Sequence, residues 1–240
     1  MRIAVVSDIH ANLHALEAAL AEIDREGVDE LWCLGDVVGY GPRPNECCDL
    51  VRERASLSLC GNHDLAVLGS LDVVEFTGDA AAAARWTATV LGEEQRAWLT
   101  SLEPFGRREG AQLFHASARD PVWEYVLSEQ AALASLLATE DPLVLVGHSH
   151  VALALGWDGR LLEGGLAPHG TSVERAGRRW LLNPGSVGQP RDGDPRAAWL
   201  LLDDERAAFR RTPYELARTQ AEIRELGLPD GLAARLAVGI

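Results

Sequence analysis

The chain has 240 residues, of which 47% are hydrophobic, and its formal net charge at pH 7 is −14. This length and apolar content suffice for one large domain with a sizeable core. The acidic balance leaves no broad basic surface, which argues against binding to long nucleic acids or to an acidic membrane surface. A small anionic ligand attracted by a locally bound metal ion is not excluded.

Cysteine usage and the first residues of the chain bear on its compartment. Four cysteines are present, and none forms a CxxC pair. Cys33 and Cys60 end apolar runs, where free buried cysteine is common. The apolar run in MRIAVVSDIH is too short for a signal peptide, and no segment reaches transmembrane length. We therefore expect a reduced, cytosolic protein without a membrane span.

Short apolar runs alternate with helical patterns at the start of the chain. Strands are predicted over residues 2–7, 30–35 and 56–61, and helices over 12–24 and 44–55. Asn12 precedes the first helix as its N-cap. This β-α-β-α-β order favours parallel strand pairing with helices covering the sheet.

The pattern changes in the second part of the chain. Helices are predicted over the alanine-rich stretch 77–102, over 128–138 and in the tail from 213, and strands over 111–117 and 143–149. The closely spaced runs ALALGWD, RRWLLNPGS, RAAWLLLD and AAFRRT then indicate antiparallel or mixed sheet. No linker or repeat divides the chain, so we expect one α/β domain over 1–240.

A helical insertion is predicted at about 66–102, and two roles stay open for it. It could pack within the fold, or it could cap a site and select a ligand. Trp86 and Trp98 lie in this segment. Core packing is the expected role for Trp32, Trp180 and Trp199, which lie in or beside predicted strands.

Residues that commonly bind metals follow the ends of five predicted strands. They are Asp8, His10, Asp36, Asn62, His63, Asp64, His115, His148 and His150. In open α/β sheets, ligands bind outside the carboxyl ends of the strands. We therefore expect these side chains to line one pocket.

Within this set, Asp8 and His10 are separated by one residue, and so are His148 and His150. In an extended chain such residues point the same way, about 6.5–7 Å apart. Side chains with this separation could contact two metal ions that lie about 3.5–4 Å apart. Mixed oxygen and imidazole ligands favour Mn²⁺, Fe, Zn²⁺ or Ni²⁺ over Ca²⁺ or Mg²⁺.

The ordered motifs DIH, GD, GNHD, FHAS and GHSH resemble those of the calcineurin-like metallophosphoesterases, over about residues 1–203. The later NPGSVGQPRDGDPRAAW is similar to the bacterial and archaeal phosphodiesterase-like branch. The resemblance implies a four-layer αββα sandwich with two mixed sheets flanked by helices. It also implies a dinuclear metal-dependent phosphoesterase, with phosphodiesters favoured, that acts through a metal-bound hydroxide.

The resemblance also implies roles for individual residues. One metal would be held by Asp8, His10, Asp36 and His150, and the other by Asp36, Asn62, His115 and His148. Manganese is the first choice of metal, with iron, zinc and nickel left open. His63 would be the general acid, and the alternative is a histidine that only supports a neighbouring ligand. Asp64 is a candidate for orienting His63.

The chain departs from the family pattern in two places. The protein phosphatases and dinucleoside tetraphosphatases of the superfamily carry GD-x-x-DRG and GNHE, whereas this chain has GDVVGYGP and GNHD. The missing arginine removes a phosphate contact and argues against both groups. Asn12, Arg191 and Arg196 are candidates for contacting a small phosphate-ester substrate instead. His14 and His169 are interpreted as satisfied or loop histidines.

Two further functions remain as alternatives. One is a protein-interaction scaffold on the same fold, as in a retromer subunit that lacks the general-acid histidine. The presence of His63 here argues for catalysis. The other is a metal-dependent nuclease, against which the acidic balance counts. No sequence signal indicates an oligomeric state.

Overall fold

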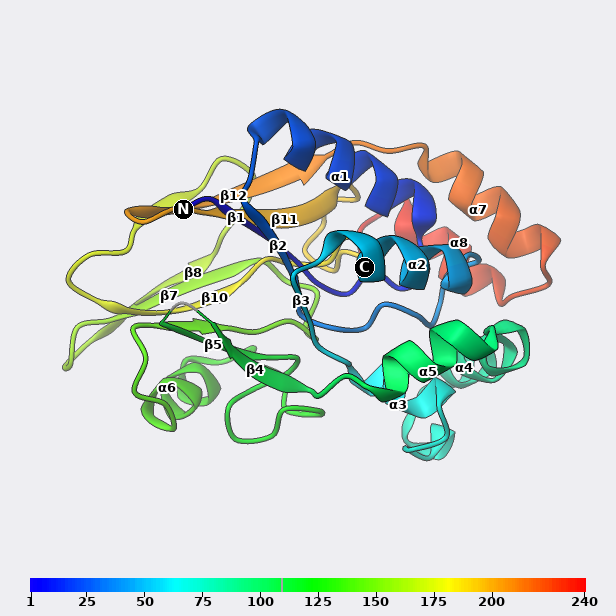
Figure 1. Ribbon diagram of the computed structural model, residues 1–240, viewed down its shortest axis with the longest axis horizontal. Coiled ribbons are helices and arrows are strands. Elements are labelled where there is room, and N and C mark those ends of the chain that lie inside the picture. The colour runs from blue at the N-terminus through cyan, green and yellow to red at the C-terminus, as the bar shows by residue number, and fades with distance from the viewer. Residues whose placement is uncertain (109) are drawn as a thin grey trace.

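Two six-stranded sheets form the centre of the computed structural model, which describes residues 1–108 and 110–240 (Figure 1). The strands of the first sheet are β1 (Ile3–Val6), β2 (Glu30–Cys33), β3 (Leu57–Ser58), β9 (Ser172–Glu174), β11 (Ala197–Leu202) and β12 (Arg206–Thr212). Their order is β3-β2-β1-β11-β12-β9. β1, β2 and β3 are parallel, as the β-α-β-α-β pattern predicted, and β11 runs antiparallel to β1.

The second sheet is also mixed. Its strands are β4 (Phe105–Arg108), β5 (Ala111–Phe114), β6 (Leu143–Leu145), β7 (Leu153–Trp157), β8 (Leu162–Leu166) and β10 (Arg179–Asn183). Their order is β4-β5-β6-β10-β7-β8. β6 is parallel to both β5 and β10, whereas β4, β7 and β8 pair antiparallel with their neighbours. The expectation of mixed pairing in the second part of the chain is confirmed.

Helices cover the outer faces of both sheets (Figure 1). They are α1 (Leu13–Glu26), α2 (Pro44–Arg54), α3 (Asn62–Val67), the 3₁₀ helix η1 (Val73–Glu75), α4 (Gly78–Val90), α5 (Glu93–Thr100), α6 (Glu129–Leu137), α7 (Leu216–Glu225) and α8 (Asp230–Leu236). Asn12 caps α1, as predicted, by accepting a hydrogen bond from the Ala15 amide. The helix predicted over 77–102 is divided into α4 and α5 at Leu91 and Gly92, because the backbone there is extended.

Three apolar layers hold the elements together. Side chains such as Trp32 and Phe209 fill the space between the two sheets. Ile23 of α1 and Trp199 of β11 lie in the core between the first sheet and its helices, and a separate cluster joins α6 to the second sheet. This is the four-layer αββα sandwich that was predicted. Trp32, Trp180 and Trp199 are buried in it, as expected.

The segment 66–102 lies beside the C-terminal helices. Ala80 and Ala83 of α4 share an apolar cluster with Leu232 of α8, and Trp86 packs against this cluster. Trp98 packs against the larger core beside the first sheet. Both tryptophans of the insertion therefore have packing roles.

The cysteines and the helices bear on the expected compartment. All four cysteines are buried and free, as the absence of CxxC pairs suggested. Across residues 1–108 and 110–240, no helix has both the length and the apolar character needed to cross a bilayer.

Candidate metal centre

The predicted site residues gather at one edge of the sandwich, where β1, β2, β5 and β6 end. All of them are buried: Asp8, His10, Asp36, Asn62, His63, Asp64, His115, His148 and His150. The Asn-His-Asp run lies at the start of α3, a helix that was not predicted. These side chains are thus close to one another in the structure.

The backbone at this edge is not extended as the sequence spacing suggested. Asp8, His10, Asp36, His148 and His150 all have φ between 50° and 63°, in the left-handed region. The prediction that each pair projects from an extended strand was therefore wrong. Non-glycine residues adopt this conformation at a cost, and they persist in it where surrounding contacts enforce it.

Backbone hydrogen bonds between neighbouring loops hold these residues in the left-handed conformation. The Asp8 amide donates to the Gly35 carbonyl at 3.0 Å, and the His10 amide donates to the Asp36 carbonyl at 2.9 Å. The loops after β1 and β2 are therefore tied together, and their left-handed turns direct the side chains to a common point.

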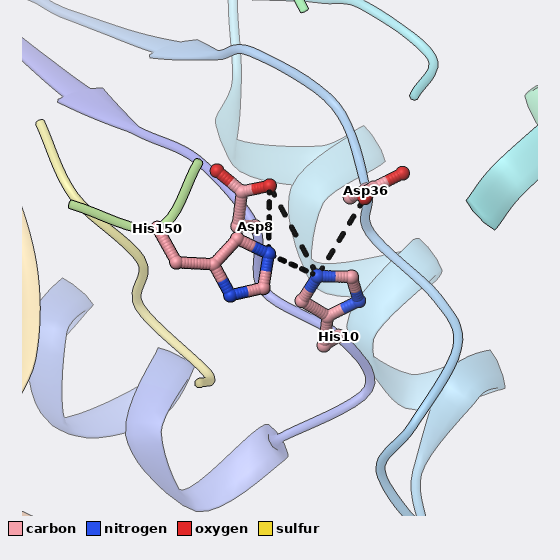
Figure 2. Close-up of side chains that lie close together, drawn as sticks. All are labelled: Asp8, His10, Asp36 and His150. Carbon is pink, nitrogen blue, oxygen red and sulfur yellow. Dashed lines mark hydrogen bonds and ion pairs between the residues drawn. The ribbon is translucent and has the colours of Figure 1, made fainter. Parts of the chain in front are cut away.

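One group of side chains consists of Asp8, His10, Asp36 and His150, whose potential ligand atoms all lie within 4.8 Å of one another (Figure 2). The Nε2 atoms of His10 and His150 are 3.0 Å apart. Asp8 Oδ1 lies 3.3 Å from His150 Nε2. Two ligand atoms at about 2.0–2.1 Å from one ion lie roughly 3–3.5 Å apart, so these separations suit ligands of a shared metal ion.

A second group adjoins the first and shares Asp36 with it. It consists of Asp36, His115 and His148, again within 4.8 Å of one another. The Asn62 Oδ1 atom lies 3.2 Å from His115 Nε2, which adds a neutral oxygen. Asp36 Oδ2 is 3.6 Å from His10 Nε2 and 3.5 Å from His115 Nε2. Among residues 1–108 and 110–240 this oxygen has no hydrogen-bond partner, so it can face cations on both sides.

The hydrogen bonds of His10 and His150 indicate that a cation belongs between their Nε2 atoms. The Nδ1 atoms of His10 and His150 lie 3.1 Å and 2.6 Å from the carbonyl oxygens of Val38 and Gln189. A carbonyl only accepts, so each Nδ1 carries the proton. A neutral imidazole then has a lone pair at Nε2. Two lone pairs that face each other at 3.0 Å repel unless a cation lies between them.

His115 repeats this arrangement in the second group. Its Nδ1 atom donates to the Leu34 carbonyl at 2.9 Å, which leaves the Nε2 lone pair facing the Asn62 oxygen. His148 Nε2 is buried and has no hydrogen-bond partner in the part of the chain that the structure describes. Backbone carbonyls on the far nitrogen fix the tautomer and the orientation of metal-ligating histidines. The donor set of this site therefore fits divalent metal ions.

The electrostatics of the cluster favour an added positive charge. Burial, with Asp64 and Asp8 nearby, raises the pKa of Asp36 well above its ordinary value. Burial also lowers the pKa of His10 and His150, with further lowering by neighbouring positive groups. Burial alone would raise the pKa of Asp8, but positive charge placed beside it, at the position of His150 above all, outweighs burial and lowers that pKa. A cation would relieve the crowding of carboxylates around Asp36.

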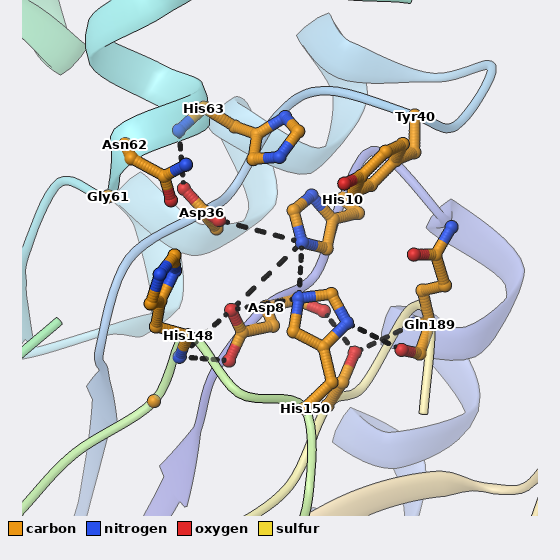
Figure 3. A network of polar contacts seen from close by, with 12 residues as sticks. Asp8, His10, Asp36, Tyr40, Gly61, Asn62, His63, His148, His150 and Gln189 are labelled. Carbon is orange, nitrogen blue, oxygen red and sulfur yellow. Dashed lines mark hydrogen bonds and ion pairs between the residues drawn. The ribbon is translucent and has the colours of Figure 1, made fainter. Parts of the chain in front are cut away.

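The loop after β10 forms hydrogen bonds that hold Asp8 and His150 in place. The Ser186 hydroxyl and the Gly188 amide both donate to the Asp8 carbonyl, at 2.7 and 3.0 Å. The Gln189 carbonyl accepts from His150 (Figure 3). This support of Asp8 and His150 was not predicted from the sequence, where only Arg191 and Arg196, further along the chain, were candidates for substrate contact. The polar run of small residues directly after a buried strand is the signal that could have indicated it.

Gly61 is required by the close approach of the two loops. A Cβ atom on this residue would lie 2.1 Å from Asp36 Oδ1 and 2.6 Å from His115 Cε1. A side chain there would displace the carboxylate shared by the two groups.

His63 lies beside both groups. Its ring centroid is 4.8 Å from that of His10 and 4.4 Å from that of Tyr40. Its Nδ1 atom is buried and has no hydrogen-bond partner among the described residues. Its backbone amide donates to Asp36 Oδ1 at 2.8 Å. Burial, and then the nearby His150 and other positive groups, lowers its pKa well below the ordinary value.

Asp64 does not have the role suggested for it. Its carboxylate accepts hydrogen bonds from the backbone amides of Val37, Val38 and Gly61. It therefore fixes the loops that carry Asp36 and Asn62, and these bonds, rather than one to the His63 ring, occupy its oxygens.

The three candidate substrate contacts differ in their partners. Asn12 donates to the Gly188 carbonyl and the Tyr214 hydroxyl, and accepts from Ala15 and Thr219, so its amide is fully occupied within the protein. Arg196 forms an ion pair with Asp194. Both arrangements argue against substrate contact.

Arg191 is placed differently. Its Nη2 atom donates to the Tyr40 hydroxyl and to Gln189 Oε1, each at 3.2 Å. Within residues 1–108 and 110–240 it has no carboxylate partner. Its guanidinium lies 5.9 Å from the centroid of the Tyr40 ring, which itself contacts His10. Arg191 is therefore a cation close to the metal-binding groups.

The two remaining histidines have structural partners, as interpreted from the sequence. His14 Nε2 lies 3.1 Å from Glu222 Oε1 and connects α1 to α7. His169 lies in a loop and accepts a hydrogen bond from the Arg211 amide.

Comparisons with known proteins agree with this geometry. The chain is 42% identical to a metallophosphoesterase from Sphaerobacter thermophilus of known crystal structure, with a TM-score of 0.89 and all of both chains covered. An uncharacterized protein of Methanocaldococcus jannaschii is 36% identical, over 99% of this chain and 98% of its own. The phosphodiesterase YfcE of Escherichia coli is 26% identical, over 85% of this chain and 89% of its own. A sequence model of the "Calcineurin-like phosphoesterase superfamily domain" matches residues 1–205. The chain therefore belongs to the calcineurin-like phosphoesterase superfamily of metal-dependent hydrolases.

Proposed function

We propose that this protein is a phosphodiesterase that uses two divalent transition-metal ions, with manganese as the first choice of metal. The observation that carries the proposal is the position of Asp36 Oδ2, which lies within 3.6 Å of a histidine nitrogen in each of the two groups. No residue that the structure describes forms a hydrogen bond with this oxygen. The similarity to a protein named as a phosphodiesterase supports a diester substrate.

The proposal assigns seven ligands. Asp8, His10, Asp36 and His150 would hold one ion, and Asp36, Asn62, His115 and His148 would hold the other. Two such ions supply an activated water nucleophile and stabilise charge on the phosphate oxygens. Two dications and two carboxylates leave a net charge of roughly +2, which attracts a phosphate to an otherwise acidic protein.

His63 is proposed as the general acid. Its ring stands against His10 and is not hydrogen-bonded through Nδ1. A bound phosphate diester brings negative charge that favours the protonated ring. His63 then transfers its proton to the oxygen of the leaving group.

Arg191 is proposed to bind a nonbridging phosphate oxygen. Its present partners, a phenol hydroxyl and an amide oxygen, are neutral, so the guanidinium can exchange them for a stronger charge-assisted bond.

We place the protein in the cytosol, where the four free cysteines remain reduced.

The substrate class can be tested with two chromogenic esters. Metal-free protein should hydrolyse neither compound, and protein restored with Mn²⁺ should hydrolyse bis-p-nitrophenyl phosphate faster than p-nitrophenyl phosphate. The initial release of p-nitrophenolate measures both rates. Preference for the monoester would change the substrate class. Failure to hydrolyse either ester, by folded protein with bound Mn²⁺, would contradict the proposal and favour a scaffold.

The affinity for Mn²⁺ should increase with pH. The raised pKa of Asp36 means that the metal-free site retains a proton that a cation must displace, whereas the lowered pKa values of His10 and His150 leave those ligands already neutral. Binding therefore releases a proton, and affinity rises by up to about tenfold per pH unit until Asp36 is ionised in the free protein. Titration calorimetry at several pH values, in buffers of different ionisation enthalpy, measures both quantities. An affinity that is independent of pH would contradict this assignment.

A further inference from the structure

Three aromatic side chains lie beside the candidate metal centre. The Phe76 ring meets the His63 ring edge-on, with centroids 4.7 Å apart, and the Trp123 ring meets Phe76 at 5.5 Å. The Tyr125 ring stacks on His148, with centroids 4.0 Å apart and an angle of 21° between the planes. We call Phe76, Trp123 and Tyr125 the aromatic rim.

The rim joins two segments that are distant in the sequence. Phe76 follows η1 in the inserted segment, whereas Trp123 and Tyr125 lie between β5 and α6. The rim therefore touches the proposed general acid through Phe76 and a proposed metal ligand through Tyr125. A substrate held at the metals would lie next to these rings.

Phe76 packs against the apolar cluster that joins α4 to α8, but the three rim side chains are not fully buried. Tyr125 is 47% exposed, and Phe76 and Trp123 are partly exposed. An exposed apolar patch beside a group of polar side chains is typical of a ligand-binding site. The rings of the rim offer flat apolar faces, which suit a planar aromatic group.

We propose that the aromatic rim binds a planar ring in the ester group of the substrate, such as a nucleobase, with Tyr125 as the main stacking residue. This inference rests on the proposed function and narrows it to phosphodiesters that carry an aromatic or nucleoside group. Rings stack on aromatic side chains largely regardless of their substituents. The rim would thus confer a preference for a class of substrate rather than for one base.

Binding to Mn²⁺-loaded protein tests the rim separately from turnover. Adenosine 5′-monophosphate and ribose 5-phosphate carry the same phosphate, and only the first has a base. Titration calorimetry should give at least about tenfold tighter binding of adenosine 5′-monophosphate, as expected from one stacking contact. In Tyr125→Ala this ratio should fall to near one, whereas Tyr125→Phe should preserve it.

Leu127→Ala is the matched control, because Leu127 is 59% exposed and lies in the same loop. It should keep the wild-type ratio, and the Mn²⁺ content of each variant shows whether the metal site is intact. Equal affinity for the two ligands in the wild type would overturn the proposal. So would no binding of adenosine 5′-monophosphate, or a Tyr125→Ala variant that weakens both ligands in equal proportion.

A kinetic comparison extends the test. Bis-p-nitrophenyl phosphate and methyl p-nitrophenyl phosphate release the same leaving group, but only the first has a second ring. The wild type should favour the first in kcat/KM, and Tyr125→Ala should lower that preference mainly through KM. A base preference in binding without hydrolysis of either ester would refute the proposed function and leave the rim supported. Hydrolysis of both without any ring preference would refute the rim alone.

Discussion

Asp36→Asn is expected to abolish phosphodiester hydrolysis and to weaken the binding of both metal ions. Asp36 Oδ1 accepts the His63 amide at 2.8 Å, while Oδ2 faces His10 and His115 without a partner. In the variant the single amide oxygen would remain on the His63 amide, so the NH₂ group would face the cations. The loss of a shared anionic ligand should lower kcat/KM by at least about 10³-fold, equivalent to about 4 kcal/mol.

The measurement is the Mn²⁺ content per chain by elemental analysis, together with the rate on bis-p-nitrophenyl phosphate. Asp204→Asn is the control, because that side chain is 83% exposed and pairs with the N-terminal amine. It should retain wild-type metal content and activity. An Asp36→Asn variant with two tightly bound ions and full activity would show that this carboxylate is not shared between the metals.

The convergence of the metal-binding residues could be predicted because it depends on topology. Parallel strands such as β1 and β2 end at the same edge of a sheet, and the residues after them necessarily meet there. The residue types then identified the chemistry. The alternation of strands and helices, predicted from the apolar pattern, was sufficient to place Asp8 and Asp36 together.

The conformation of the loops could not be predicted. Spacing by one residue suggested an extended backbone at Asp8 and His10, but both have left-handed φ values. Such conformations are unfavourable locally and are imposed by bonds from other loops, for example from the Asp8 amide to Gly35. Nothing in a linear pattern reveals a constraint that arises only after the loops pack together.

The edge strands and the partners of polar side chains could not be predicted from the sequence either. β4, with the sequence FGRR, and β8, with LEGGL, carry too few apolar residues to be recognised as strands. They form because a strand adjacent in the sequence, β5 for β4 and β7 for β8, offers unpaired backbone groups. In the same way, the sequence could nominate Asn12 and Arg196 as polar candidates, but their protein partners are distant in the chain or local to a turn.

His63 is the residue whose role most needs a discriminating test. A general acid and a histidine that merely supports the site would both lower activity when replaced. His63→Gln keeps a polar side chain of similar size, and its backbone amide can still donate to Asp36. Loss of general-acid catalysis should reduce kcat by about 10²–10⁴-fold while both metal ions stay bound. His169→Gln, at a loop position, is the matched control and should have little effect.

The dependence on the leaving group separates the two roles of His63. p-Nitrophenolate is a good leaving group and departs without much help from an acid, whereas an alkoxide needs its proton. If His63 supplies that proton, His63→Gln should impair a diester with an alkyl leaving group far more than bis-p-nitrophenyl phosphate. A supporting histidine would instead lower both rates by the same factor, with loss of metal. Equal loss on the two substrates, with reduced Mn²⁺ content, would therefore assign His63 to support of the metal centre through Asp36.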